Sequence, residues 1–453
     1  MWYNKRYYRM SQWVKNLGER LKALELGERY IRRSWLYYPE AVRTFFRLQE
    51  ASLDERKAFA ERRLETVLRA ASKTAYGREF RGKPLHEWPL LPKERVRGRE
   101  EEFLTRPKWL TSHGSMGGTA GIPLKLYRSL QSICYEQATY DYPLLKRGLN
   151  PLSIRIATLR GDNLKDPSDL EPPFWKFVAN GRKLIFSSNH LCPKTVRYYY
   201  QALKEFAPDC LFAYPSSLES LCLLMQENGL SLRIPLVIAT SEAMRTEARL
   251  LAAQVLNAEV LHSYGAGERV AFAWSERVEE YFMFAGYGWV ELVPVSEDEN
   301  SITFEIVGTG FWNNAMPLVR YQMADLITLP KDVDPELVCW GVQPFKGVQG
   351  RQSDYLISPE GARLMGIDHF PREVDNVLRM QVIQPALDFV RVLVIPAQGF
   401  GDHNLEQIQR NIRRKLPQSM RVQIEVVDEL VRTPSGKTPY VIREFEGDNQ
   451  ESS

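Results

Sequence analysis

The stretch that decides the fold of this chain is Ser112–Tyr127, which reads SHGSMGGTAGIPLKLY. Four glycines and several hydroxyl side chains precede a short run that resembles a β-strand. Because glycine has no Cβ, a glycine-rich backbone can bring its N–H groups around phosphate oxygens. The stretch lacks G-x-x-x-x-G-K-[ST], so it is not a Walker A loop. It is a candidate phosphate loop of another kind, with a flexible or tight turn as the alternative.

The segments on either side of this loop differ in their periodicity. From Met1 to about Arg81 the apolar residues recur at helical spacing. Beyond the loop, short β-rich runs such as Ser153–Leu159, Pro235–Thr240 and Glu259–Tyr264 alternate with helix-like stretches. This alternation predicts a mixed or parallel sheet covered by helices.

The second half of the chain favours two further units. Between Tyr281 and Leu329 four β-rich runs follow one another, which predicts β-hairpins. The last hundred residues predict a small α+β unit, with strands at Asp388–Pro396 and Arg421–Asp428. Its helix carries one apolar face, made of Leu405, Ile408, Ile412 and Leu416. The expected fold class is therefore α/β: a large N-terminal domain of several subdomains with mixed sheets and helices, and a small C-terminal α+β domain.

Composition and charge narrow the function classes. The 453 residues are 44% hydrophobic and 26% charged, with a net charge of +4, as in an ordinary globular protein. Residues 1–50 carry 11 Lys and Arg against 5 acidic residues, whereas the rest carries 49 against 51. A basic surplus confined to one end argues against a nucleic-acid partner. Five scattered cysteines without a C-x-x-C pair favour a reducing, cytoplasmic location.

Five short motifs occur in a fixed order: GSMGGTAGIP, SYGAGE, PLVRYQMAD, GRQSDYL and RTPSGK. With this set the chain resembles the adenylate-forming superfamily of acyl-CoA synthetases and related ligases. Within it the chain resembles the phenylacetate-CoA ligase-like and CapK-type proteins. Weaker matches to the same subfamily, in TVLRAASKTAYGREF and WPLLPKERVR, extend the resemblance back to about residue 64. It implies an extension over residues 1–60, a large adenylate-forming domain over 61–350 and a mobile lid over 351–453.

The resemblance also implies a set of site residues. Tyr264 would stack beside the adenine, and Asp325 would accept hydrogen bonds from the ribose hydroxyls. Glu268 and Thr119 would hold Mg²⁺, and Lys437 would be the catalytic lysine of the lid, with Glu268 as its catalytic partner. The complete ATP-binding set would be Ser115, Gly117, Gly118, Thr119, Gly121, Ser241, Glu242, Tyr264, Gly265, Asp325 and Arg351, and the acyl pocket would be lined by Tyr214, Ser263, Ala266 and Gly267.

Two positions qualify this assignment. Ile122 stands where the family loop often carries Lys or Arg before its proline. Ser353 occupies a hinge position where the family has an acidic residue, which puts lid rotation in question. The run at Ala213–Glu219 favours a turn that opens a helix, with Ser216 or Ser217 as the N-cap.

The expected function is biosynthetic activation of a small carboxylic acid, with an aryl acid as first choice, to acyl-AMP with release of pyrophosphate. ATP and Mg²⁺ are the expected cofactors. The acyl group would pass to CoA, an amine or a carrier-protein thiol. The chemistry agrees with this, since joining a carboxylate to a phosphate requires positioning and added positive charge. The alternative is a non-catalytic relative that binds nucleotide or acts as a scaffold.

The basic N-terminal segment lies outside the resemblance. It combines Lys and Arg with aromatic residues, among them Trp2, Tyr7, Trp13 and Trp35. Contact of residues 1–50 with a membrane surface or a partner protein is one hypothesis, which would make the protein peripheral to the membrane. A helical arm packed on its own body is the other.

Overall fold

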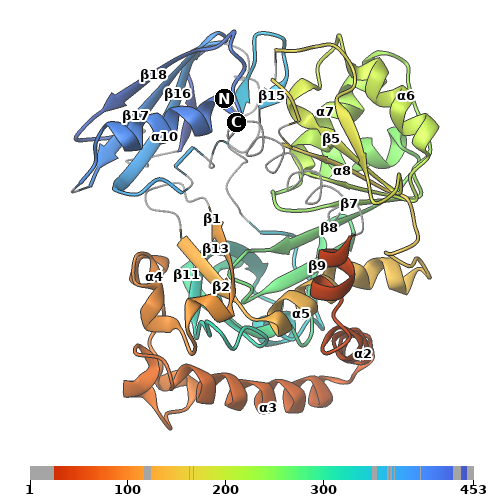
Figure 1. Cartoon of the computed structure of the whole chain (residues 1–453). Helices are drawn as coiled ribbons and strands as arrows, with labels where there is room; N and C mark the ends of the chain where they lie inside the picture. Colours follow the sequence, from red (N-terminus) through yellow and green to blue (C-terminus); the bar gives the residue numbers. More distant parts are fainter. Residues whose placement is uncertain are drawn as a thin grey trace, which may run out of the picture.

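The computed structural model describes residues 25–116, 124–162, 164–166, 168–348, 355–364, 367, 370–371, 373–397, 399–431 and 440–445, apart from the side chains of 115, 116 and 378 (Figure 1). Two blocks lie side by side in the upper half of Figure 1, and a third block forms the lower half. The upper blocks are the C-terminal unit in blue and a helical layer in yellow and green.

Two helices near the N-terminus lie along the base of the molecule, α2 (Tyr38–Glu50) and α3 (Leu53–Ala71) (Figure 1). A capping box starts α3, because the Ser52 hydroxyl accepts from the Glu55 N–H and the Glu55 carboxylate accepts from the Ser52 N–H. The predicted helical character of this region is confirmed over Tyr38–Glu50 and Leu53–Ala71, whereas residues 1–24 lie outside the described part of the chain. The buried face of the two helices carries apolar residues at helical spacing: Ala41, Phe45, Leu48, Ala60, Leu64, Val67 and Ala71.

Short helical turns replace a regular helix after Ala71, because glycines and prolines interrupt the pattern there. Gly77 needs no side chain, since a Cβ at this position would lie 2.1 Å from the Ala71 carbonyl oxygen. The short turns of the chain are η1 (Gly27–Arg32), η2 (Gly77–Phe80), η3 (Leu85–Glu87), α4 (Lys93–Val96), η4 (Glu100–Phe103), η5 (Lys108–Leu110), η6 (Ser188–His190) and α9 (Pro335–Cys339).

An eight-stranded sheet forms the centre of the molecule, in the order β10-β9-β8-β7-β6-β3-β5-β4. The five inner strands from β8 to β5 are parallel, and the strands at both ends are antiparallel. This confirms the predicted mixed sheet. The strands are β3 (Ile156–Arg160), β4 (Trp175–Val178), β5 (Lys183–Ser187), β6 (Cys210–Ala213), β7 (Leu236–Ala239), β8 (Glu259–Gly265), β9 (Phe272–Arg277) and β10 (Glu280–Met283).

Helices cover both faces of this sheet, which explains the continuous apolar run of β7. Val237 and Ala239 face one core, and Leu236 and Ile238 face the other. The first core lies under the crossover helices α6 (Val196–Phe206), α7 (Pro215–Glu227) and α8 (Thr246–Val255), and the second packs against α2, α3 and α5 (Leu130–Lys146).

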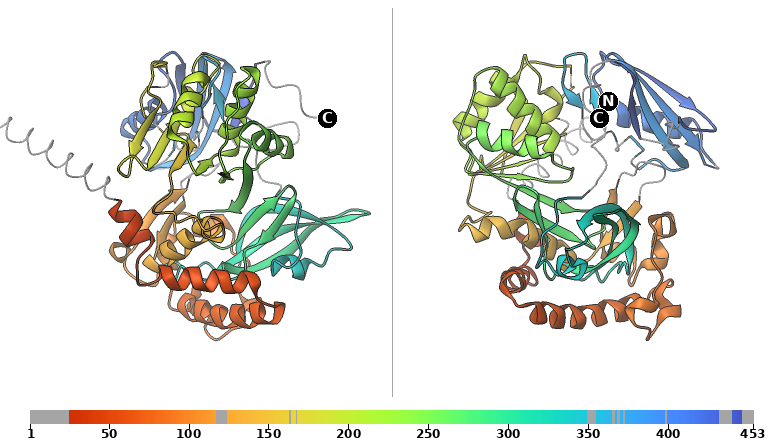
Figure 2. Two further views of the ribbon diagram at one scale, coloured as in Figure 1. Left: turned by 90° about the vertical axis from the view of Figure 1, so that its right-hand side faces the viewer. Right: turned by 180° about the vertical axis from the view of Figure 1, so that it is seen from behind.

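Two antiparallel sheets complete the lower half of the molecule. The predicted hairpins are confirmed, but the first of the four runs forms β10, which pairs with β9 in the central sheet. The later runs form the three-stranded sheet β11 (Gly288–Glu297), β12 (Ser301–Gly310) and β13 (Tyr321–Pro330), whose long hairpin extends from the body in Figure 2. The candidate phosphate loop is flanked by the hairpin strands β1 (Ser112–Met116) and β2 (Leu124–Arg128). The loop itself lies outside the described residues.

The C-terminal unit is the predicted α+β structure with its own core. Its four-stranded sheet has the order β18-β17-β16-β19 and packs against one helix. Ile408, Ile412 and Leu416 of the predicted apolar face are fully buried in this core. The elements are β14 (Leu356–Ile357), β15 (Arg363–Leu364), β16 (Val377–Ala386), β17 (Phe389–Pro396), α10 (Asp402–Arg413), β18 (Arg421–Val426) and β19 (Val441–Arg443).

Two polar contacts join the C-terminal unit to the helical layer beside it. The Arg363 guanidinium at β15 lies 3.2 Å from the Glu219 carboxylate of α7. The Lys415 ammonium donates to the Gly161 carbonyl oxygen at 2.7 Å. Within the described residues, no helix is both long and apolar enough to cross a bilayer.

Candidate active site

The carboxyl ends of β7 and β8 bring two groups of predicted site residues together. The two strands are parallel neighbours with Ala239 opposite His262, so the turn after β7 lies beside the end of β8. That turn contains Ser241 and Glu242, and β8 runs into Tyr264 and Gly265. Ligands of open α/β sheets bind at this edge, because the loops that follow parallel strands gather there.

A cavity of about 220 Å³ opens at this edge. Its walls come from the turn after β7, the end of β8, and more distant segments that include β10 and β13. The predicted residues among its lining are Ser241, Glu242, Ser263, Tyr264, Gly265 and Asp325, and the others are Ala243, Met244, His262, Tyr281, Lys346, Gly347 and Val348.

Asp325 reaches this cavity from β13, which belongs to a different sheet from β8. The Tyr264 hydroxyl donates a hydrogen bond of 2.8 Å to its carboxylate and lies 3.4 Å from the Met323 sulfur. Burial, followed by the charge of Asp325, raises the pKa of Tyr264 well above its usual value. The phenol therefore stays protonated and holds the carboxylate against the cavity wall.

His262 and Tyr281 form a second polar pair in the cavity wall. The His262 Nε2 atom lies 2.8 Å from the Glu242 carbonyl oxygen, which can only accept, so Nε2 carries the proton. The Tyr281 hydroxyl donates to Nδ1. Burial lowers the pKa of His262 to about 4. The imidazole is therefore neutral at ordinary pH and fixes the backbone of the turn after β7.

Glu242 has a structural partner outside the cavity. Its carboxylate accepts from the Ser216 N–H at 3.0 Å and so caps the first turn of α7. The predicted N-cap at Ser216 or Ser217 is wrong, because the helix begins two or three residues earlier than expected and Tyr214 is the N-cap residue, without a side-chain cap. Tyr214 itself does not line the cavity, and the Arg160 guanidinium lies 5.7 Å from its ring centroid.

Glu268 lies just beyond the turn that leaves β8 and is only 6% exposed. Its Oε1 atom accepts from the Tyr321 hydroxyl at 2.9 Å and from the Lys93 ammonium at 3.2 Å. Its Oε2 atom is buried and has no hydrogen-bond partner among the described residues. A buried carboxylate oxygen that faces no donor suits a hard cation, because Mg²⁺ prefers oxygen ligands. Glu268 therefore fits its expected role at Mg²⁺.

Sequence reasoning missed Lys93 and Tyr321 as partners of Glu268. Both lie in stretches that carried the resemblance, WPLLPKERVR and PLVRYQMAD, so the signal was present. Burial, with the charge of Glu268 second, raises the pKa of Tyr321 far above its usual value. Tyr321 is therefore a permanent hydrogen-bond donor to the carboxylate.

Arg128 is a further cation that the motifs did not indicate. It ends β2, donates to the Gly267 carbonyl oxygen at 3.2 Å, and lies over Gly114, where an added Cβ would meet its guanidinium at 3.0 Å. Its Nε atom is buried and has no partner among the described residues. Burial and the nearby Arg269 lower its pKa to about 10. It places positive charge beside the strand that enters the candidate phosphate loop, whose own position 122 is isoleucine.

The remaining predicted residues are not brought into the cavity or cannot be placed. Ala266 and Gly267 form the turn between β8 and β9, where the Arg269 N–H donates to the Ala266 carbonyl oxygen at 3.0 Å. Ser115 belongs to β1 and pairs with Lys125 through its backbone. The residues that lie outside the described part of the chain are Gly117, Gly118, Thr119, Gly121, Arg351 and Lys437.

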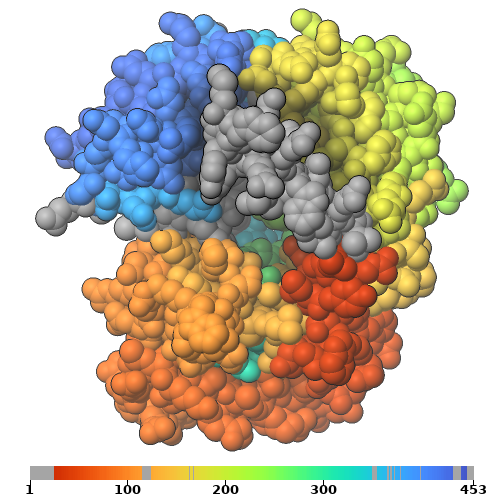
Figure 3. Space-filling model, in the orientation of Figure 1, coloured from red at the N-terminus to blue at the C-terminus, as the bar shows by residue number. Residues whose placement is uncertain are grey.

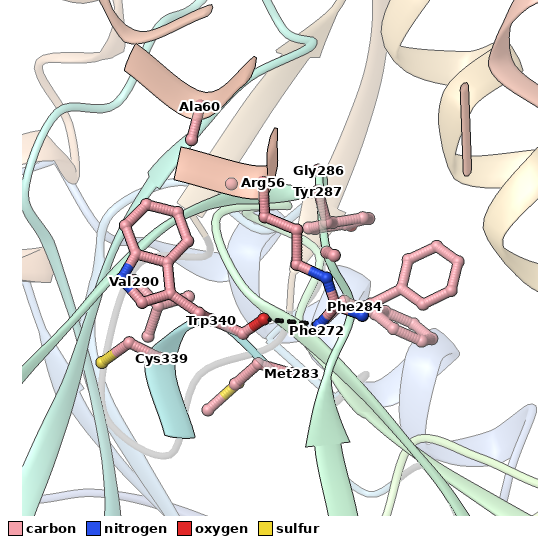
Figure 4. A pocket seen from close by; sticks show the side chains of 12 residues that line it. Arg56, Ala60, Phe272, Met283, Phe284, Gly286, Tyr287, Val290, Cys339 and Trp340 are labelled. Carbon is pink, nitrogen blue, oxygen red and sulfur yellow. Dashed lines mark hydrogen bonds between the residues drawn. The ribbon is translucent and has the colours of Figure 1, made fainter. Parts of the chain in front are cut away.

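A second, very small cavity of about 10 Å³ lies between α3 and α9, and Figure 4 shows its lining. The Arg56 side chain crosses it and donates to the Trp340 and Gly341 carbonyl oxygens, both at 2.9 Å. These bonds satisfy the end of a short helix. With room for about one water molecule, this cavity is structural.

Comparisons with known proteins agree with this description. Residues 356–444 match the model of the CapK C-terminal domain family. Over 418 residues the chain is 20% identical to Protein CapK of Staphylococcus aureus, covering 90% of this chain and 92% of that one. Among solved structures, 2-hydroxyisobutyryl-CoA ligase in complex with 2-HIB-AMP and CoA is 15% identical, with a TM-score of 0.50 and coverage of 87% and 91%. The acyl-CoA synthetase of Brucella canis covers 72% of this chain and 62% of its own, at 16% identity and a TM-score of 0.34.

The resemblance inferred from the five motifs is confirmed by the family-model match, the CapK relative and the 2-hydroxyisobutyryl-CoA ligase structure. Residues 356–444 of the C-terminal unit match the CapK C-terminal domain model, and nine tenths of the chain is similar to a CapK protein. The predicted α/β fold class is confirmed, and the fold is similar to that of the 2-hydroxyisobutyryl-CoA ligase.

Proposed function

We propose that the protein uses ATP to convert a small carboxylic acid to acyl-AMP with release of pyrophosphate, and then transfers the acyl group to a second nucleophile. The observation that carries this proposal is the cavity at the ends of β7 and β8, which the Asp325 carboxylate closes from another sheet. A cavity with one aromatic wall and one fixed carboxylate suits a nucleoside, because the ring stacks and the ribose diol donates to the carboxylate.

The residues around the cavity take distinct roles in this proposal. Asp325 binds the ribose, oriented by Tyr264, and Ser241 and Glu242 border the adenine. His262 keeps the turn after β7 in place. The glycine-rich loop between β1 and β2 surrounds the phosphates.

Attack by a carboxylate on a phosphate brings two anions together, so the site must supply positive charge. Arg128 and Lys93 provide two cations near the loop and near Glu268. Mg²⁺ would be held by Glu268 through Oε2 and by Thr119, and it would offset phosphate charge. Lys437 would contribute a further ammonium from the C-terminal unit.

The two half-reactions would use the C-terminal unit differently. We propose that residues 351–453 act as a lid that moves between them, with residues 61–350 as the adenylate-forming domain and 1–60 as an extension. CoA is the first acceptor to test, because the 2-hydroxyisobutyryl-CoA ligase of similar fold was solved with CoA. An amine or a carrier-protein thiol are the other acceptors, and an aryl acid is the first acid to test. We place the protein in the cytoplasm, since its five cysteines are free thiols.

The proposal is tested by carboxylate-dependent exchange between ATP and pyrophosphate across a panel of acids. We expect exchange with at least one acid, and its loss in Glu268→Gln and Lys437→Ala. Arg410→Ala is the matched control, because it removes an exposed cation from the same C-terminal unit. Absence of exchange with every acid, despite measurable ATP binding, would support the alternative of a non-catalytic nucleotide-binding or scaffold protein. Full activity of Lys437→Ala would refute only the role of that lysine.

A further inference from the structure

An apolar surface is exposed at the beginning of the described chain. Within eleven residues, five large apolar side chains face solvent, with Trp35 at 79% and Tyr30 at 66% of their full exposure. Figure 3 shows the elements of this segment in red on the front of the molecule. We call this set the N-terminal docking surface, and it consists of Leu26, Tyr30, Ile31, Trp35 and Leu36.

Buried ion pairs hold this surface firmly on the body. Arg33 binds the Asp141 carboxylate of α5 through two hydrogen bonds, of 2.7 and 2.8 Å, and the Tyr38 hydroxyl donates to the same carboxylate at 2.6 Å. Glu25 pairs with Arg182 and with Lys183 on the central sheet. The apolar side chains are therefore presented outward from a fixed backbone.

The same contacts direct the acidic side chains of this N-terminal segment inward and leave basic side chains exposed. Its acidic side chains are directed inward, since Glu25 pairs with the body and Glu28 pairs with Arg33 at 3.1 Å. Arg29 is exposed, and Arg32 remains more than half exposed although it lies 3.4 Å from Glu28. The outward charge among the apolar residues is therefore positive.

The sequence that precedes this surface has the same character. Residues 1–24 contain six Lys and Arg against the single acidic residue Glu19. They also contain five Trp and Tyr residues. These aromatic residues are Trp2, Tyr3, Tyr7, Tyr8 and Trp13.

We propose that the N-terminal docking surface binds the surface of an anionic lipid bilayer, with Trp35 and its apolar neighbours inserted at the headgroup level. Trp and Tyr prefer that level because one part of the side chain is apolar and another is polar, and arginine is attracted to anionic headgroups. The bilayer is favoured over a second copy of the chain because the surface repels itself electrostatically. The inference is independent of the proposed enzymatic function.

Co-sedimentation with vesicles tests this proposal on the full chain. The vesicles contain phosphatidylcholine, alone or with about a quarter phosphatidylglycerol. The docking variant is Trp35→Ser with Leu36→Ser. The control is Trp109→Ser with Leu110→Ser, an exposed pair of matched exposure elsewhere, at 80% and 53% against 79% and 51%. Thermal unfolding checks that both variants fold.

We expect the natural chain to sediment with the anionic vesicles far more than with the neutral ones, and less as salt is raised. The docking variant should bind at least about tenfold more weakly, since two inserted side chains are lost, and the control should bind like the natural chain. Equal sedimentation of the docking variant and the natural chain would overturn the proposal. So would equal binding to neutral vesicles, or a concentration-dependent dimer that the docking variant abolishes.

Discussion

The hydrogen bond between Tyr264 and Asp325 offers a quantitative test of the proposed nucleotide site. Tyr264→Phe removes the hydroxyl that donates at 2.8 Å to the carboxylate and leaves the ring in place. A hydrogen bond to a charged group contributes about 1.5–3 kcal/mol. About 1.4 kcal/mol corresponds to a factor of ten in affinity. If the whole contribution of this hydrogen bond were lost from ATP binding, the affinity for ATP would therefore fall by about 10-fold to 150-fold. We expect the lower end, because in the proposed site the Phe ring would still stack beside the adenine.

The assay is ATP–pyrophosphate exchange at saturating acid, with KM for ATP and kcat measured separately. We expect KM to rise about tenfold while kcat changes less than about threefold, as when binding common to ground and transition states is lost. Tyr199→Phe is the control, because it removes a buried hydroxyl that donates to the Ser187 carbonyl oxygen at 2.6 Å, away from the cavity. It should lower stability by about 1 kcal/mol and leave KM unchanged. An unchanged KM in folded Tyr264→Phe would refute the assignment of Asp325 to the ribose.

Three further predictions concern stability and domain contact. Burial lowers the pKa of His262 to about 4, below its unfolded value near 6.5, so the stability it contributes is present above pH 6.5 and decreases as the pH falls toward 4. Urea unfolding should show a loss of about 3 kcal/mol over that interval, and a His262→Gln variant with the same pH slope would contradict this. Gly265→Ala should lower the free energy of unfolding by about 1–3 kcal/mol, because the new Cβ would lie 2.6 Å from the buried Phe272 ring. Thermal unfolding measures this loss, and an unchanged melting temperature would show that the ring can move. Glu219→Gln weakens the contact with Arg363, so limited proteolysis should release the C-terminal unit faster than from the natural chain. Release at the natural rate would show that this ion pair does not hold the C-terminal unit in place.

Much of the fold follows from local patterns in the sequence. The apolar run that forms β7 was recognisable because a strand covered on both faces has few polar positions. The apolar face of α10 was recognisable because every third or fourth residue meets the same core. The start of α7 was misplaced, because its first turn is capped by Glu242, which lies 26 residues away from Ser216 in the chain. Local rules do not register such a partner.

The order of the motifs and the chemistry of their side chains indicated which residue types form the candidate site. The tertiary structure determined which groups those residues contact. The motifs pointed to Tyr264, Glu268 and Asp325 as separate positions in the chain. They did not indicate that Tyr264 donates to Asp325 across 61 residues, or that Lys93 reaches Glu268 across 175. Those pairs depend on how the β13 sheet packs on the central sheet, which no single segment specifies.

The sequence by itself therefore determined the class of fold, the family resemblance and the chemical types at the site, because helical and strand periodicity and short motifs are local properties. Only the tertiary structure decided which oxygen of Glu268 lacks a hydrogen-bond partner among the described residues, which groups line the cavity, and which charges of the N-terminal segment face outward. The physical reason is that hydrogen bonding, burial and charge pairing belong to pairs of groups, and the partners meet only when distant segments pack together.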